Sequence, residues 1–162
     1  MAVNLRKKSH KYSNAWTLAF GLGLSVVGFI LALGSYNPND PSLNTFSSTW
    51  KSPTNVLGYL GSWLSDLLYQ GFGLSAWLFP LLLFAAILRW SIRGEHKEKI
   101  LGSRWWAAWA LLSMSVCLCL EIFRVSSPLT GFPIQGLLGF ALGAVTLPLV
   151  GKIGAFLLCL VG

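Results

Sequence analysis

The chain has 162 residues, of which 54% are hydrophobic and only 10% are charged, and its mean hydropathy is +0.64. A typical soluble domain carries about 25% charged residues. The composition therefore excludes an ordinary soluble enzyme and indicates an integral membrane protein. The net charge of +7 would suggest a nucleic-acid partner for a soluble protein, but here the positions of the basic residues matter more than their number.

The 12 lysines and arginines are spread unevenly along the chain. Four lie in the tail 1–15 and five lie at or between Arg89 and Arg104, whereas the stretches 37–72 and 123–150 hold one each. Basic loops remain on the cytoplasmic side of a membrane. The pattern predicts a cytoplasmic tail and a cytoplasmic loop at 91–104, with 37–72 and 123–150 on the outside.

The membrane domain is expected to cover residues 16–162, and its first span residues 16–36, bounded by Trp16 and Tyr36. A span needs about 20 mostly apolar residues. The alternative is a secretory signal peptide, because Arg6–Lys8 make a basic start and Ala32-Leu33-Gly34 resembles a cleavage site. The apolar stretch is longer than the usual 7–15 residues of a signal peptide, and we favour a retained helix.

An amphipathic segment is predicted at 55–69, between the first two spans. Its large apolar residues recur at helical spacing, whereas Ser62, Ser65 and Asp66 lie on the other face. We expect it to lie on the outer interface, with Leu64 and its apolar neighbours toward lipid or the bundle and the polar face toward water.

The second span is expected at 72–90, with Pro80 inside it as a structural kink rather than a gating hinge. Proline frees the carbonyl four residues earlier, which is that of Ala76. The third span is expected at 105–123, opening with three tryptophans. Glu121 is expected near its outer end, with a carboxylate that reaches water rather than a role as a proton relay.

The fourth span is incomplete at 150–162, and it follows a second outer amphipathic segment at 134–148. Thirteen helical residues cover about 20 Å, short of the roughly 30 Å that a bilayer core requires. We therefore expect a fragment whose continuation completes the helix. The predicted fold is an all-α integral membrane protein, a four-span helical bundle with amphipathic outer-face helices and a truncated last span.

An internal repeat accompanies this plan. A shift of 78 residues places Gly58 on Gly136, Gly61 on Gly139, Leu64 on Leu142 and Gly73 on Gly151. Each copy is then an outer segment with G-x-x-G, a glycine break and a span. Twofold internal similarity is common in membrane bundles.

Catalytic and ligand-binding signatures do not stand out. The only Gly-Lys pair, Gly151-Lys152, lacks the rest of a phosphate-binding loop. Cys117, Cys119 and Cys159 lie inside apolar runs, and we interpret them as apolar fillers rather than zinc ligands or disulfide partners. We therefore expect no enzyme activity, metal or cofactor in this chain.

Several short motifs follow one another along the chain. They are Asp40-Pro41-Ser42 after the first span, Asn55-x-x-Gly58-x-x-Gly61-x-x-Leu64-x-Asp66, and Gly71-Phe72-Gly73-x-x-Ala76-x-x-x-Pro80, with Gly136, Gly139 and Gly151 in the second half. Together these motifs resemble the N-terminal four-span domain of the FtsK/SpoIIIE DNA translocases. The resemblance covers essentially the whole chain.

The resemblance implies an anchor at the division septum of the bacterial inner membrane. It implies as partners the lipid bilayer, further copies of the chain and other septal division proteins. ATP, Mg²⁺ and DNA would be bound only by a motor domain that these residues do not include. The competing functions are a small transporter or channel subunit, which polar residues inside the spans would favour, and a membrane enzyme. The basic loop at 91–104 is expected to serve topology and anionic lipid rather than DNA.

Overall fold

The computed structural model describes residues 2–42, 52–92, 102–123 and 133–161, and every regular element in these ranges is helical. The elements are α1 (Ala2–Gly34), α2 (Gly58–Phe72), the 3₁₀ helix η1 (Gly73–Trp77), α3 (Leu78–Ile92), α4 (Ser103–Phe123) and α5 (Gly136–Val161). The prediction of an all-α membrane protein is confirmed.

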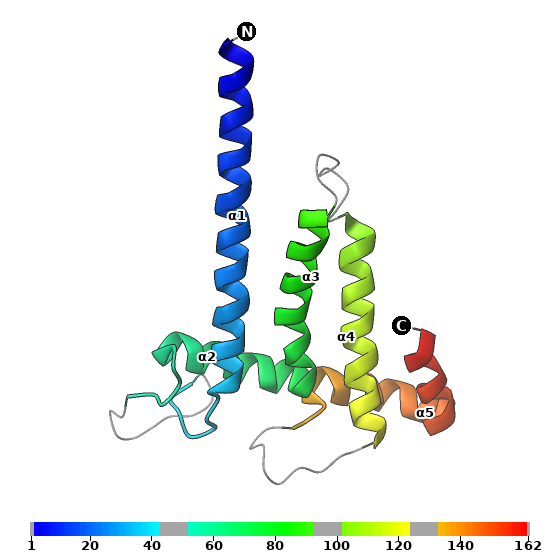
Figure 1. Ribbon diagram of the computed structural model, residues 1–162. Coiled ribbons are helices and arrows are strands. Elements are labelled where there is room, and N and C mark those ends of the chain that lie inside the picture. The colour runs from blue at the N-terminus through cyan, green and yellow to red at the C-terminus, as the bar shows by residue number, and fades with distance from the viewer. Residues whose placement is uncertain (1, 43–51, 93–101, 124–132, 162) are drawn as a thin grey trace.

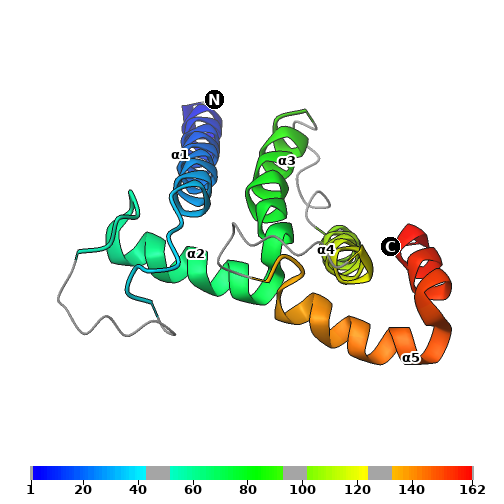
Figure 2. The ribbon, with the colours of Figure 1, turned by 90° about the horizontal axis from the view of Figure 1, so that it is seen from below.

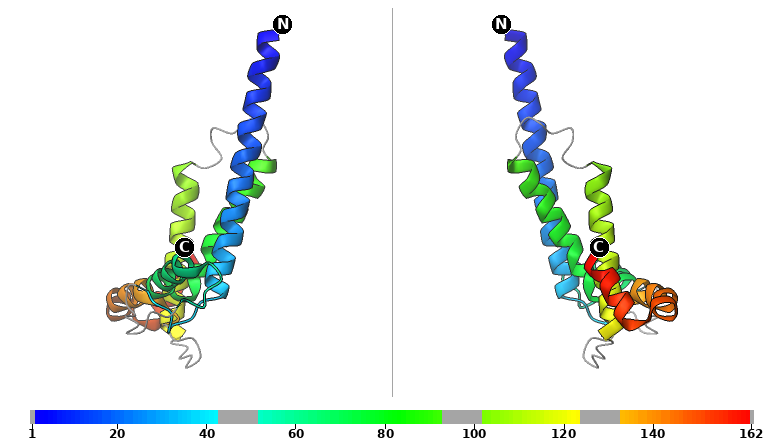
Figure 3. Two further views of the ribbon diagram at one scale, coloured as in Figure 1. Left: turned by 90° about the vertical axis from the view of Figure 1, so that its left-hand side faces the viewer. Right: turned by 90° about the vertical axis from the view of Figure 1, so that its right-hand side faces the viewer.

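The helices form two sets with different directions. Helices α1, α3 and α4 stand side by side, while α2 and the first part of α5 lie across one end of them (Figure 1). The side views show the same arrangement, with the crossing helices gathered at the end away from the N-terminus (Figure 3). We call α2 and the part of α5 before Gly151 the crossing layer. The expected amphipathic segments 55–69 and 134–148 fall largely within it.

Three helical stretches of the described chain are long and apolar enough to cross a membrane, namely Gly58–Arg89, Ser103–Phe123 and Gly136–Leu160, and Ala19–Gly34 is a shorter apolar one. The first of these has 32 residues, which at 1.5 Å per residue exceeds a core of about 30 Å. It also bends at Gly73, so that α2 lies across the bundle and only α3 stands with the other helices (Figure 1). The depth of each helix in a bilayer stays a prediction.

The buried core lies where α1, α2 and η1 meet. It contains Leu33, Leu68, Tyr69 and Ala76, with Phe72, Phe79 and other large side chains packed against it. Many large apolar side chains instead point outward from the standing helices, among them Phe20, Val27, Leu81, Phe84 and Leu111. A soluble protein would bury such a surface, whereas a membrane protein presents it to lipid.

Pro80 does not kink the middle of a span. It lies in the first turn of α3, directly after η1, where a helix needs no N–H from this residue. The Leu78 N–H donates to the carbonyls of Ser75 and Ala76. The predicted kink was wrong because the bend is at Gly73 and the straight helix begins only at Leu78.

The internal repeat reappears in the backbone. Among the described residues, the glycines with positive φ are Gly58 (63°), Gly73 (59°), Gly136 (64°) and Gly151 (68°). Glycine is the residue that adopts this conformation without steric cost. In each pair separated by 78 residues, both glycines therefore have a similar positive φ. Gly58 and Gly136 lie at the starts of the crossing helices, and Gly73 and Gly151 lie at their ends.

Each half of the chain thus has a standing helix, a crossing helix, a glycine corner and a second standing segment. In the second half the corner is Gly151, which interrupts α5 with non-helical angles. Seen from below, α2 and α5 follow one another in a single row under the standing helices (Figure 2). The largest contacts between helices also lie within each half, where α1 packs on α3 and α4 packs on α5.

Candidate functional site

Part of the FtsK/SpoIIIE-like motifs gathers at the end of α1, namely Asp40, Pro41, Ser42, Asn55, Gly61 and Asp66. Segment 35–42 and residues Thr54 and Asn55 meet the polar face of α2 there, and we call this region the polar junction. Asp40 is its centre and is 5% exposed. Its carboxylate accepts hydrogen bonds from the Thr54 N–H at 2.9 Å, the Thr54 hydroxyl at 3.0 Å and the Asn55 N–H at 2.9 Å. Asp40 therefore binds Thr54 and Asn55, the segment that leads into α2.

Asn55 joins this segment before α2 to the end of α1. Its side-chain N–H₂ donates to the carbonyls of Ala32 at 2.9 Å and Ser35 at 3.3 Å, and its Oδ1 accepts from the Leu57 N–H at 3.0 Å. The last carbonyls of a helix have no partner within it, and here the Asn55 amide supplies one. A Cβ on Gly61 would collide with Asn55 Oδ1, so the glycine allows this close approach.

The polar face of α2 packs on segment 35–42 instead of facing water. Ser62 is 3% exposed and Asp66 is 6% exposed. The Ser62 hydroxyl donates to the Pro41 carbonyl at 2.8 Å, while Asp66 accepts from the Tyr36 hydroxyl at 3.2 Å and from Gln70 at 2.9 Å. The prediction of a solvated polar face was wrong, because these side chains satisfy the backbone and side chains of a neighbouring loop.

Tyr36 remains a hydrogen-bond donor in this environment. Burial, together with the nearby carboxylate of Asp66, raises the pKa of Tyr36 to about 12. The hydroxyl therefore keeps its proton and donates to Asp66. The Tyr36 ring also contacts that of Tyr69, with centroids 4.8 Å apart, which links the polar junction to the apolar core.

The opposite face of α2 is the exposed one. Leu60 is 76% exposed, Leu67 58% and Trp63 48%, whereas Leu64 packs partly against the core. This apolar surface agrees with the expected contact of the stripe with lipid or with another protein surface.

Cysteine labelling tests this orientation. With Ser62→Cys we expect slow reaction with a water-soluble maleimide in intact membranes, because the side chain is buried under segment 35–42. Asn39→Cys is the matched control, since Asn39 lies in the same polar junction with an exposed side chain. Equally fast labelling at both positions would mean that the polar face of α2 is solvated after all.

A second contact site joins the two halves, and we call it the inner junction. The Leu74 N–H donates to the Ile134 carbonyl at 2.8 Å. A Cβ on Gly73 would collide with the Ile134 carbonyl oxygen, and one on Gly136 would lie 2.5 Å from the Gly73 nitrogen. Two backbones therefore touch here, which is possible only with glycine at both positions.

Close packing continues along α4 and α5. A Cβ on Gly139 would lie 2.5 Å from the Cys117 carbonyl oxygen, and one on Gly143 would lie 2.5 Å from Glu121 Cγ. Glu121 is only 3% exposed. The prediction that its carboxylate reaches water was wrong, because α5 covers this end of α4.

The predicted motif residues thus divide into three places. Asp40, Asn55, Gly61 and Asp66 hold the polar junction together, and Pro41 contributes its carbonyl while Ser42 follows it. The glycines Gly58, Gly73, Gly136, Gly139 and Gly151 lie in or at the ends of the crossing layer. Pro80 begins α3, and Leu64 packs against the core. Their roles in function stay predictions.

Sequence reasoning missed four members of this network, namely Tyr36, Thr54, Tyr69 and Trp77. Tyr69 donates to the Leu33 carbonyl at 3.1 Å, and the Trp77 indole donates to the Tyr69 hydroxyl at 2.9 Å. One signal was present, since aromatic residues with a polar atom find a hydrogen-bond partner when buried. The partners, however, lie on other segments of the chain, and no pattern within a single segment reveals them.

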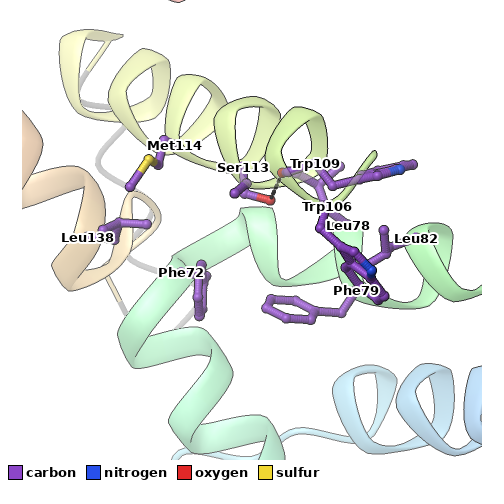
Figure 4. Close-up of a pocket in the computed structure, with 10 residues that line it drawn as sticks. Phe72, Leu78, Phe79, Leu82, Trp106, Trp109, Ser113, Met114 and Leu138 are labelled. Carbon is purple, nitrogen blue, oxygen red and sulfur yellow. Dashed lines mark hydrogen bonds between the residues drawn. The ribbon is translucent and has the colours of Figure 1, made fainter. Parts of the chain in front are cut away.

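An apolar cavity of about 420 Å³ lies between α3 and α4. Phe72, Phe79, Trp106, Met114 and Leu138 are among the side chains that line it (Figure 4). The Ser113 hydroxyl donates to the Trp109 carbonyl of its own helix. Such a lining fits hydrocarbon and supplies no acid–base pair. Across the described ranges, no group of three His, Cys, Asp or Glu could hold a metal ion.

Fold and site together define an all-α multi-pass membrane protein whose crossing helices are fixed by glycine corners and buried polar contacts. Residues 13–162 match the family described as the 4TM region of DNA translocase FtsK/SpoIIIE. The chain belongs to this family, as the sequence motifs predicted.

Individual relatives agree. The DNA translocase FtsK of Rickettsia typhi (strain ATCC VR-144 / Wilmington) is 44% identical over 72 residues, which cover 44% of this chain and 10% of that protein. Those of Rhizobium meliloti (strain 1021) and Azospirillum brasilense are 33% and 32% identical, over 76% and 83% of this chain and 14% and 21% of those proteins. The chain therefore spans a tenth to a fifth of these relatives. No solved structure matches it significantly.

Proposed function

We propose that this chain is the membrane anchor of a septal DNA translocase. In this role it holds the protein in the bacterial inner membrane and binds other division proteins and further copies of itself. ATP, Mg²⁺ and DNA are then bound by a motor domain outside these residues. The match of residues 13–162 to the 4TM family is the observation that carries the proposal.

The distribution of polar groups supports an anchor rather than a transporter. Arg89, Arg104 and Glu121 lie near the ends of α3 and α4. Asp40 and Asp66 lie in the polar junction, where they make structural hydrogen bonds. A transport path would need such groups at the middle of the standing helices.

Localisation tests the proposal directly. The chain fused to a fluorescent protein and imaged in dividing cells should give a band at the division site. Even fluorescence around the whole membrane would contradict the septal role, and diffuse cytoplasmic fluorescence would contradict the anchor itself. The same reporter on an unrelated inner-membrane protein is the control for membrane area at the septum.

Orientation is a separate prediction of this proposal. The basic residues of the tail and of the loop 91–104 favour a cytoplasmic location for both, and we expect the crossing layer on the opposite side of the membrane. Reporter fusions at Asn44 and Glu95, which both lie outside the described residues, are expected to report opposite compartments. The same compartment at both positions would contradict this topology.

A further inference from the structure

The inner junction has an unused counterpart elsewhere in the same chain. At the inner junction, Gly73 and Leu74 at the end of α2 meet Ile134 and Gly136 at the start of α5. The repeat relates residues 78 positions apart. In the second half, Gly151 and Lys152 correspond to Gly73 and Leu74. In the first half, Val56 and Gly58 correspond to Ile134 and Gly136. The chain therefore carries a second corner and a second helix start of the same kind.

These two counterparts do not meet within one molecule. The start of α2 and the corner of α5 lie at opposite ends of the row of crossing helices (Figure 2). Apart from the adjoining backbone and chain neighbours of each glycine, no described atom lies within 4 Å of the position that a Cβ would take on Gly58 or on Gly151. Both glycines nevertheless have the φ angles of their partners in the inner junction, 63° against 64° and 68° against 59°.

The exposed fractions also differ between the residues of the inner junction and their counterparts 78 positions away. Ile134 is 9% exposed at the inner junction, whereas its counterpart Val56 is 66% exposed. Ser75, one residue beyond Leu74, is 3% exposed, whereas its counterpart Ile153 is 80% exposed. The unused corner and the unused helix start thus expose the apolar side chains of Ile153 and Val56, and their glycines have φ angles similar to those of two surfaces that already fit each other.

We propose that the Gly151 corner of one copy binds the start of α2 of a second copy and repeats the inner junction between molecules. In this arrangement the Lys152 N–H donates to the Val56 carbonyl of the neighbouring copy, as the Leu74 N–H does to Ile134. The glycine conformations allow the two backbones to touch, and the exposed Val56 and Ile153 become buried. This inference deepens the self-association part of the proposed function.

The contact is head-to-tail, because it joins two different surfaces of the chain. Such an interface propagates, and it gives a closed ring when the rotation between copies closes and an open array when it does not. The inner junction is already one head-to-tail contact of this kind within the chain, because it joins the end of α2 to the start of α5 and both helices run in the same direction under the bundle (Figure 2). Lipid alone would cover the apolar side chains but would not reproduce the paired backbone contact.

Disulfide trapping in native membranes tests the proposal. A backbone hydrogen bond between two residues holds their Cα atoms about 5–6 Å apart, which suits a disulfide. Cys117, Cys119 and Cys159 are first replaced by Ala. The variant with Val56→Cys and Lys152→Cys is then oxidised, and it should give a ladder of dimers, trimers and larger species. Either substitution alone should leave only monomer.

Two further variants in the same background serve as controls. Leu74→Cys with Ile134→Cys should close a disulfide within one chain and give no ladder, which shows that the background folds. Val56→Cys with Phe140→Cys pairs the helix start with an exposed position in the middle of the crossing layer, and it should give no ladder.

Three results would overturn the proposal. The first is monomer only from the Val56–Lys152 pair in membranes where the inner junction does cross-link. The second is dimer from Val56→Cys alone, which would indicate a two-fold symmetric contact. The third is an equal ladder from the Phe140 control, which would indicate random collision. Septal localisation is measured separately, so a failure here leaves the anchor function to its own test.

Discussion

Replacing Gly73 with Ala is expected to lower the free energy of unfolding by about 3–4 kcal/mol. A backbone with positive φ and extended ψ, a region essentially confined to glycine, costs about 1–3 kcal/mol for a residue with a Cβ, and crowding a packed site adds about 1–3 kcal/mol. Both apply here, because Gly73 has a φ of 59° and its new Cβ would collide with the Ile134 carbonyl. Reversible unfolding of the purified chain in mixed detergent micelles, followed by circular dichroism, measures the loss.

Gly151→Ala is the matched control for this variant. Gly151 has a φ of 68° but no described atom within 4 Å of its Cβ position. In detergent, at dilutions where the chain is monomeric, we expect it to lose only the conformational cost of about 1–3 kcal/mol, because its φ of 68° and ψ of 178° suit glycine alone. Equal losses for Gly73→Ala and Gly151→Ala would mean that the backbone contact of the inner junction contributes nothing.

The second large effect is expected for Asp40→Ala, at about 3 kcal/mol of unfolding free energy. Hydrogen bonds to a charged group contribute about 1.5–3 kcal/mol each, and a buried donor left without its partner adds to the loss. Asp40 accepts from two backbone N–H groups and one hydroxyl. The same detergent unfolding experiment measures this loss of unfolding free energy. We expect the segment at Thr54 to detach from the end of α1.

Substitutions at two neighbouring residues give losses of unfolding free energy with which that of Asp40→Ala can be compared. Thr54→Val removes the hydroxyl that donates to Asp40 and accepts from Asn37, but it keeps both backbone bonds to Asp40, and it should cost about 1–2 kcal/mol. Asn39→Ala changes an exposed side chain next to Asp40 in the sequence, and should stay within about 0.5 kcal/mol of the parent chain. A loss for Asp40→Ala no larger than that for Asn39→Ala would show that the polar junction does not stabilise the fold.

Much of the helical plan could be predicted from the sequence. Apolar runs and amphipathic spacing indicated the helices now seen as α2 and α4, and the 78-residue shift found glycine pairs that share one backbone turn. These features are local, since they depend on the side chains of one segment and on the special conformations of glycine. The family resemblance was readable for the same reason, because its motifs are short and ordered along the chain.

The predictions that were wrong concern which other segments of the chain a helix contacts. Periodicity showed that Ser62 and Asp66 share one face of α2, but it could not show that segment 35–42 would cover that face. The same holds for Glu121, which α5 covers, and for Pro80, whose role depends on where the helix begins. Contacts between distant segments decide all three, and no single-segment pattern contains them.

The order of helices along the chain also determines how the molecule is assembled during synthesis. Residues 2–92 contain α1, α2 and α3 and can pack on one another while the second half is still being made. Gly136 follows Gly73 by 63 residues, a delay of about 3–13 s at typical translation rates of 5–20 residues per second. During that interval Gly136 has not yet been made, so it cannot cover the glycine corner at Gly73. Docking of Gly136 against it is therefore a late step, and a chaperone or another nascent copy has several seconds in which to compete for that corner.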